Sequence, residues 1–279
     1  MIETRNTGKI LVIAALALLI GLIQSGEARK ARLKLATTTS VDNSGLLEYI
    51  LPDFEKLAGL KVDVISVGTG KALKLAENGD VDVVLVHAPD AEAKFIAAGF
   101  GVNRRELMKN DFLFVGPPED PAGIKKAGSL ARTLKKLKST KAVFISRGDD
   151  SGTHKKELKL WKLAGGKPTH KNYLETGQGM EATLRITFEK KGYTMTDRGS
   201  YLAIGKKIGL VPVFEGDPDL INRYSAIAVN PAKHEHVRYM DAMMFIAWLS
   251  SPKIQARIAS FKVDGEILFH PTAVPQPEK

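Results

Sequence analysis

The fold class is most evident in the segment Val143-Phe-Ile-Ser-Arg-Gly-Asp-Asp-Ser-Gly-Thr-His-Lys-Lys-Glu157. Its apolar start is typical of a buried strand, and a turn rich in Ser, Gly and Asp follows. A helix is then predicted over Thr153–Leu163, where Leu158, Trp161 and Leu163 recur at helical spacing. The N–H groups at the start of such a helix carry the positive end of its dipole, so the turn suits an anion.

Side chains in this turn provide further hydrogen-bond donors. Arg147 adds a fixed positive charge, and Ser151 and Thr153 add hydroxyl groups. Asp149 and Asp150 follow Arg147 closely, and the sequence does not give their direction. They either cap the helix, pair with Arg147, or accept a proton from a ligand. The alternative interpretation of the whole turn is an ordinary capped helix start.

The same arrangement of strand, polar turn and helix recurs twice near the start of the chain. A predicted strand, Leu33–Ala36, continues into the four hydroxyl residues Thr37–Ser40 and then into a helix over Leu46–Ala58. Four hydroxyl residues in a row suit neither a strand nor a helix interior, but they are good caps and anion donors. A second predicted strand, Lys61–Val67, ends in Gly68-Thr-Gly70 and opens another helix. That turn lacks the spacing of nucleotide-binding glycine loops, yet its N–H groups can hold one tetrahedral oxyanion.

Strands and helices alternate along the rest of the chain, which predicts an α/β protein with mainly parallel sheets. Val81–His87, for example, is a continuous apolar run typical of a buried parallel strand. Ligands of such sheets bind beyond the carboxyl ends of the strands, where all three polar turns lie. His87 is the last residue of this predicted strand, at the same edge of the sheet. Its side chain either packs in the interior or contacts the ligand. Glu175–Met180 either reaches the same cleft or caps the following helix.

The start of the chain predicts a secretory signal peptide over residues 1–28. Basic residues precede the apolar run Ile10–Ile23, and the small residues Gly26 and Ala28 follow it. As a helix this run spans only about 21 Å, short of a hydrocarbon core of about 30 Å, so an uncleaved anchor is the weaker alternative. Because the chain has no cysteine, it carries neither disulfides nor a lipid on cysteine. We therefore expect a soluble mature protein in a bacterial periplasm.

Three other functional classes are disfavoured. The net charge of +10 comes with lysine runs that have no interleaved aromatics, so we expect no nucleic-acid binding. Ser151 and His154 lack the Gly-x-Ser-x-Gly context and a third partner, so we expect no enzyme. His234-Glu-His236 lacks the spacing of a helical zinc motif, so we expect no metal site.

Several motifs occur together and in a fixed order: Ala-Thr-Thr-Thr-Ser, Val-Gly-Thr-Gly-Lys-Ala-Leu, Asn-Gly-Asp-Val-Asp-Val-Val-Leu-Val-His-Ala-Pro, Ser-Arg-Gly-Asp-Asp-Ser-Gly-Thr-His-Lys and Glu-Thr-Gly-Gln-Gly-Met. With the export signal, this ordered set resembles the tungstate-binding proteins of bacterial ABC importers, from about residue 33 to 270. The resemblance implies the type II periplasmic binding-protein fold, in which two α/β lobes are joined by two crossover strands and close over one ligand.

The resemblance also implies where the chain divides. Phe112–Pro117 and Tyr224–Pro231 are the candidates for the crossover strands. Lobe one is then expected over residues 29–112 plus 225–279, and lobe two over residues 113–224.

Carried onto this sequence, the resemblance implies an oxyanion site with donors from both lobes: Thr38, Thr39, Ser40, Thr69, Gly70, Arg147, Ser151, Gly152 and Thr153. The expected ligand is tungstate or molybdate, and phosphate or sulfate are alternatives because Arg-x-x-x-Ser-Gly-Thr is also similar to phosphate-binding proteins. No cofactor is expected. The expected partner is the permease of an ABC transporter in the inner membrane, and the receptor itself is expected to be a monomer.

Overall fold

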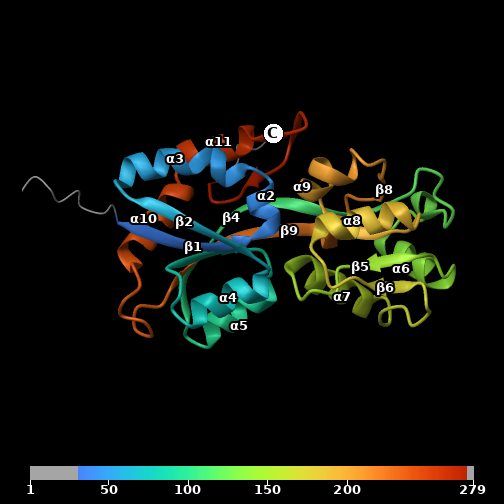
Figure 1. Ribbon diagram of the computed structural model, residues 1–279, viewed down its shortest axis with the longest axis horizontal. Coiled ribbons are helices and arrows are strands. Elements are labelled where there is room, and N and C mark those ends of the chain that lie inside the picture. The colour runs from blue at the N-terminus through green and yellow to red at the C-terminus, as the bar shows by residue number, and fades with distance from the viewer. Residues whose placement is uncertain (1–30, 275–279) are drawn as a thin grey trace, which may run out of the picture.

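A computed structural model describes residues 31–274 (Figure 1), so the predicted signal peptide lies outside the described residues. Within 31–274, no helix is both long and apolar enough to cross a membrane. The elements as far as the first long strand are β1 (Arg32–Thr38), α2 (Thr39–Asn43), α3 (Leu46–Ala58), β2 (Lys61–Val67), α4 (Thr69–Glu77), β3 (Val83–Val86), α5 (Pro89–Ala97) and β4 (Gly101–Gly116).

The remaining elements follow in two groups. Up to the last long strand they are η1 (Ile124–Lys126), α6 (Leu130–Ser139), β5 (Phe144–Ser146), α7 (Gly152–Leu163), β6 (Tyr173–Glu175), α8 (Met180–Glu189), β7 (Thr194–Asp197), α9 (Arg198–Ser200), η2 (Tyr201–Gly205), β8 (Val211–Phe214), η3 (Pro218–Leu220) and β9 (Ile221–Val229). The end of the described chain contains α10 (Tyr239–Leu249), α11 (Pro252–Ser260), β10 (Lys262–Val263), β11 (Glu266–Ile267) and β12 (His270–Pro271).

The strand β1 lies between β2 and β3 and is parallel to both. Leu35 pairs with Val64 of β2 and with Val83 of β3. Helices cover both faces of this part of the sheet, with α3 on one side and α4 and α5 on the other (Figure 1). This explains the apolar character of the strands and brings the carboxyl ends of β1 and β2 to one edge, where α2 and α4 begin.

The first polar turn differs from the prediction. We expected Thr37–Ser40 to lie outside regular structure, but β1 continues through Thr38 and a short helix starts at Thr39. The Thr37 hydroxyl donates to the carbonyl oxygen of Leu85 at 2.9 Å, which satisfies it inside the sheet. Propensity alone missed this, because a neighbouring strand supplies the acceptor.

The strand β4 passes from one part of the molecule to the other. It pairs with β9 over Gly101–Asp111 and with β7 and β8 over Phe112–Gly116, always antiparallel. In Figure 1, β4 and β9 run between the helices around β1 and those around β5. The predicted crossover segments Phe112–Pro117 and Tyr224–Pro231 overlap these two strands and extend one and two residues beyond their ends. The division into lobes at 112/113 and 224/225 stays a prediction.

The sheets are mixed, which corrects the expectation of mainly parallel pairing. The main sheet has the order β12-β4-β9-β3-β1-β2, and only β1 with β2 and β1 with β3 are parallel pairs in it. Elsewhere β5 and β6 are parallel. The long crossing strands enter antiparallel because the chain returns along β9 to the side it left along β4. The α/β class itself is confirmed.

Two large hydrophobic clusters hold the elements that carry the polar turns. One cluster joins Leu184 and Leu202 to Leu113 and Phe269, so apolar packing continues across β4. The other contains Trp161, Phe144 and Tyr193. In it the Trp161 ring meets the edge of Phe144 at a centroid distance of 5.2 Å. This contact fixes α7 against β5, on either side of the third turn.

Candidate functional site

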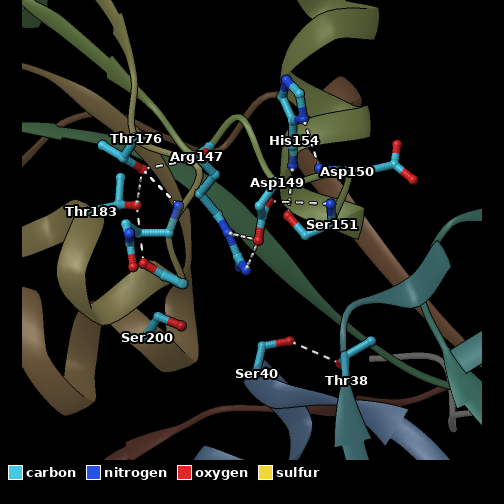
Figure 2. A network of polar contacts seen from close by, with 12 residues as sticks. Thr38, Ser40, Arg147, Asp149, Asp150, Ser151, His154, Thr176, Thr183 and Ser200 are labelled. Carbon is cyan, nitrogen blue, oxygen red and sulfur yellow. Dashed lines mark hydrogen bonds and ion pairs between the residues drawn. The ribbon is translucent and has the colours of Figure 1, made fainter. Parts of the chain in front are cut away.

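The three polar turns face one region of the structure. Figure 2 shows Arg147 extending from the third turn toward Ser40 and Thr38 of the first, with Ser200 also facing this space. A cavity of about 390 Å³ adjoins this region, with Thr39 and Ser40 of the first turn and Gly179, Met180 and Ser200 in its lining. We call this cavity and the space between the turns the cleft.

In the first turn, the hydroxyl groups of Thr38 and Ser40 lie 3.1 Å apart and both side chains are buried. Thr38 is the N-cap of α2, yet no side chain caps that helix. Thr39 lies on the cleft wall. The turn thus gathers hydroxyl donors and uncapped N–H groups at the end of β1.

The second turn presents a buried donor without a partner. Thr69 is fully buried, and its hydroxyl makes no hydrogen bond among residues 31–274. The N-cap of α4 is Gly68, so no side chain caps this helix either. A buried hydroxyl that stays unpaired costs about 1–3 kcal/mol, so a bound acceptor would stabilise this site.

The glycines of the second turn allow two helix N-termini to meet. A Cβ atom on Gly68 would lie 3.8 Å from the Cα of Ser151, and one on Gly70 would lie 2.8 Å from an Asp150 carboxylate oxygen. The start of α4 therefore touches the start of α7, with the positive ends of both dipoles together. Gly70 provides clearance for this approach in addition to its predicted role as a donor.

In the third turn, Asp149 holds the guanidinium of Arg147. The Nε and Nη2 atoms of Arg147 donate to Oδ2 of Asp149 at 3.1 and 2.5 Å, and the Ser151 N–H donates to Oδ1 at 3.2 Å. Burial tends to raise the pKa of Asp149, but the hydrogen bond from Ser151 and the charge of Arg147 outweigh it and hold the pKa below its usual range. Asp149 is thus an ionised partner of Arg147, one of the alternatives that the sequence left open.

Asp150 points away from the cleft. It has a φ of +58°, its carboxylate is exposed, and that carboxylate pairs with Lys155. Its backbone N–H donates to Nδ1 of His154 at 3.1 Å, which holds the left-handed turn in place. Both carboxylate oxygens of Asp149 are therefore engaged, whereas Asp150 pairs with Lys155 through Oδ1 and its Oδ2 lies beside Gly70 of the second turn.

The α7 helix begins at Gly152 and is capped by Ser151, whose hydroxyl oxygen accepts from the His154 N–H at 3.2 Å. The cap uses a lone pair of the hydroxyl, and the same hydroxyl stabilises the Asp149 carboxylate by hydrogen bonding. Thr153, in the first turn of the helix, is buried. The prediction of an anion-binding turn and the prediction of a capped helix are therefore compatible.

Glu157 joins the elements on either side of this turn through hydrogen bonds. Its carboxyl accepts hydrogen bonds from Ser146 at 2.8 Å, from Trp161 Nε1 at 2.9 Å and from the Tyr173 hydroxyl at 2.8 Å. Ser146 directly precedes Arg147, so α7, β5 and β6 are joined one residue away from the guanidinium. Burial raises the pKa of Glu157 to about 7, against the three donors, which lower it.

Sequence reasoning left His87 undecided and missed its partners. His87 is buried at the end of β3, within 3.5 Å of the Ser40 hydroxyl, and bonded through Nδ1 to Asn222 at 2.9 Å. Asn222 lies on β9, which pairs with β3 across 135 residues of sequence. Sequence reasoning also missed Ser200, because its position on the cleft wall depends on long-range packing. Gly179 and Met180 place the end of the Glu175–Met180 segment on that wall as well.

The site offers many donors and one fixed charge. Arg147 faces the hydroxyls of Thr38 and Ser40 in Figure 2. The α4 N-terminus, with its buried Thr69 hydroxyl, meets the α7 N-terminus at Ser151. Such a donor set compensates the large desolvation cost of a buried anion. Residues 31–274 contain no cluster of three or more metal-ligating side chains.

A mixed α/β fold with a cleft that is lined by hydrogen-bond donors is typical of a solute-binding protein. A sequence model described as a PBP superfamily domain matches residues 24–253, and the chain belongs to this superfamily.

Comparison with individual relatives identifies the family within this superfamily. The tungstate-binding protein TupA of Peptoclostridium acidaminophilum is 44% identical over 256 residues, which cover 89% of this chain and 90% of the relative. The tungstate-binding protein TupA from Desulfovibrio alaskensis has a solved structure with a TM-score of 0.78 and 48% identity, over 88% of this chain and 100% of that one. The tungstate ABC transporter structure from Geobacter sulfurreducens has a TM-score of 0.76 and 54% identity, over 82% and 98% of the two chains. The chain is a member of the same family as these TupA proteins.

Proposed function

We propose that this chain captures tungstate and delivers it to the permease of an ABC importer. The observation that carries the proposal is the meeting of the α4 and α7 N-termini at a buried Thr69 hydroxyl that has no hydrogen-bond partner among the described residues 31–274. Two dipole ends and an unpaired donor favour an anionic ligand. The names of the relatives supply the choice of tungstate and of an ABC transporter.

The proposed ligand donors are those that the sequence predicted: Thr38, Thr39, Ser40, Thr69, Gly70, Arg147, Ser151, Gly152 and Thr153. They come from the two proposed lobes, residues 29–112 plus 225–279 and residues 113–224. Only the closed arrangement completes the donor set, so the anion favours closure. The permease then distinguishes loaded from empty receptor.

The site favours anions without a proton. At neutral pH phosphate retains a proton and needs an acceptor, whereas tungstate, molybdate and sulfate do not. Both carboxylate oxygens of Asp149 are engaged, and Asp150 pairs with Lys155 at the surface. We therefore place phosphate behind the proton-free anions, and molybdate is the alternative natural ligand.

The proposal also includes the localisation, the oligomeric state and the partner of the chain. The mature chain acts as a non-catalytic monomer in the periplasm, without a cofactor, and its partner is the permease in the inner membrane. The predicted signal peptide over 1–28 and the similarity to the tungstate ABC transporter structure from Geobacter sulfurreducens support this setting.

The test is the melting temperature of the mature chain, stripped of ligand, with tungstate, molybdate, sulfate or phosphate. A ligand at about 1,000 times its dissociation constant adds about 4 kcal/mol to the stability of the folded state. We expect a large upward shift with tungstate, matched or trailed only by molybdate. A shift with phosphate alone would overturn the ligand assignment, and no shift with any of the four anions would overturn the function.

A further inference from the structure

His87 lies at the junction of three segments that carry the site. Its ring stacks on Tyr224 of β9 with a centroid distance of 4.9 Å. On another side it meets Gly152, where a Cβ atom would lie 2.7 Å from Cε1 of the ring. Its Nε2 lies 3.5 Å from the hydroxyl oxygen of Ser40. The imidazole therefore touches both the first turn and the start of α7.

The hydrogen bonds of Asn222 fix the tautomer of His87. The Nδ2 of Asn222 donates to Oδ1 of Asn110 and to the hydroxyl of Tyr224, both at 2.8 Å. These two bonds use both amide hydrogens, so Oδ1 of Asn222 is the acceptor for Nδ1–H of His87. The neutral ring thus carries its hydrogen on Nδ1, and Nε2 presents a lone pair toward Ser40.

The surroundings keep His87 neutral while the cleft is empty. Burial lowers the pKa of His87, the nearby charge of Arg147 lowers it further, and Asp197 together with the bond to Asn222 opposes them. The start of α7 adds its positive dipole end on the Gly152 side. A second cavity of about 260 Å³ adjoins the ring, and its charged lining residues are Asp90, Lys155, Lys156, Lys159, Asp219 and Arg223. Four of these six are cationic, which also disfavours an imidazolium.

We propose that His87 is a positioning residue for Ser40 and takes up one proton from solvent when the cleft binds a dianion. In the neutral ring, the Nε2 lone pair competes with the ligand for the Ser40 hydroxyl hydrogen. In the imidazolium, Nε2–H donates to the Ser40 oxygen and directs the hydroxyl hydrogen toward the ligand. The proton adds to Nε2, and no other bond forms or breaks.

Charge balance supplies the driving force. A dianion beside Arg147 and the α7 N-terminus offsets the positive charge that kept the ring neutral, so the imidazolium becomes the favoured form. By linkage, an anion that promotes proton uptake binds more tightly when protons are abundant. The inference deepens the proposed oxyanion capture and depends on it.

Calorimetry with sodium tungstate at pH 7.5, in two buffers of different ionisation enthalpy, counts the protons. Tungstate carries no proton at this pH, so any exchange comes from the protein. For the wild type we expect an uptake of roughly half a proton or more per anion, and a dissociation constant that falls about threefold or more from pH 8.5 to 6.5. His87→Gln should lose both effects. His270→Gln, a matched change at an exposed histidine of β12, should keep both.

The possible outcomes distinguish a failure of the role of His87 from a failure of the proposed function. Tight binding with no buffer dependence in the wild type, or with equal dependence in His87→Gln, would refute the role of His87 and leave oxyanion capture intact. An absence of tungstate binding in the wild type would overturn both.

Nitrogen NMR of the wild-type imidazoles gives an independent readout that needs no variant. We expect the Nε2 resonance of His87 to move to the protonated position on addition of tungstate. A resonance that stays at the neutral position in the saturated protein would refute the proposal.

Discussion

Replacing Glu157 by Gln tests whether burial or hydrogen bonding controls this carboxyl. The side chain is 2% exposed and its two oxygens accept from Ser146, Trp161 and Tyr173. In the variant, the amide oxygen can accept from Trp161 and Tyr173, and the amide nitrogen can donate to the Ser146 oxygen. The change therefore removes the charge and keeps a hydrogen bond at both polar atoms of the side chain.

The direction of the effect follows from the pKa. Burial raises the pKa of Glu157 from 4.5 to about 7, so the folded state holds this proton more tightly than the unfolded chain. The contribution to stability is complete below pH 4.5 and is lost as the pH rises through 7. At about 1.4 kcal/mol per pH unit, the loss over 2.5 units amounts to at most about 3.5 kcal/mol. The glutamine variant escapes this loss, so it should gain stability over the wild type between pH 5 and 8.

Urea denaturation at pH 5, 6, 7 and 8 without oxyanion measures the difference in the free energy of unfolding. Glu189→Gln, at an exposed position at the end of α8, is the control and should follow the wild-type profile. Parallel pH profiles for wild type and Glu157→Gln would refute the reasoning. They would mean that the three donors keep the carboxylate charged in both states and outweigh its burial.

Three changes in the polar turns should affect tungstate affinity to different degrees. Gly152→Ala places a Cβ atom 2.7 Å from the ring of His87, which is held by stacking and by hydrogen bonds, so calorimetry should show a loss of more than about tenfold, or 1.4 kcal/mol. Gly70→Ala meets only the carboxylate tip of Asp150, an exposed side chain that can swing aside, so the loss should be about threefold or less. Equal losses for the two glycines would contradict this. Arg147→Ala should weaken binding by at least about tenfold, and unchanged affinity would exclude Arg147 as a ligand group.

The sequence predicted the local parts of this structure well. The helix over Leu46–Ala58 has the predicted limits, and α7 begins one residue before its predicted start. Capping residues, glycines and apolar spacing act within a few residues of each other, so they can be recognised in the sequence. Three turns at the carboxyl ends of strands follow from the same local signals.

Long-range contacts account for what was missed. The strand β4 starts at Gly101, eleven residues before the predicted crossover segment Phe112–Pro117. The sequence did not indicate this part of the strand because charged residues such as Arg104 and Arg105 lie exposed along it. Its pairing with β9 provides the backbone hydrogen bonds that the side-chain pattern did not indicate. The contact between His87 and Asn222 depends on that same sheet order. The residues that position the site depend on this long-range strand pairing, which the sequence does not show. The hydrogen-bond donors lie in the turns, which local sequence signals predict.

The direct contacts around the start of α7 are weak, so an anion bound there would add to the free energy of closure. Between the proposed lobes, the start of α7 meets Gly68, Gly70 and His87, and these contacts are small. The ion pair of Asp90 and Lys159 also joins the two sides at 2.9 Å, but its side chains are 76% and 59% exposed. Such a pair contributes about 1 kcal/mol or less. Apolar packing of Leu184 and Leu202 with Phe269 also joins the proposed lobes. An anion would add to these contacts by pairing the Thr69 hydroxyl, which has no partner among residues 31–274, so we expect the closed form to be more populated when an anion is bound.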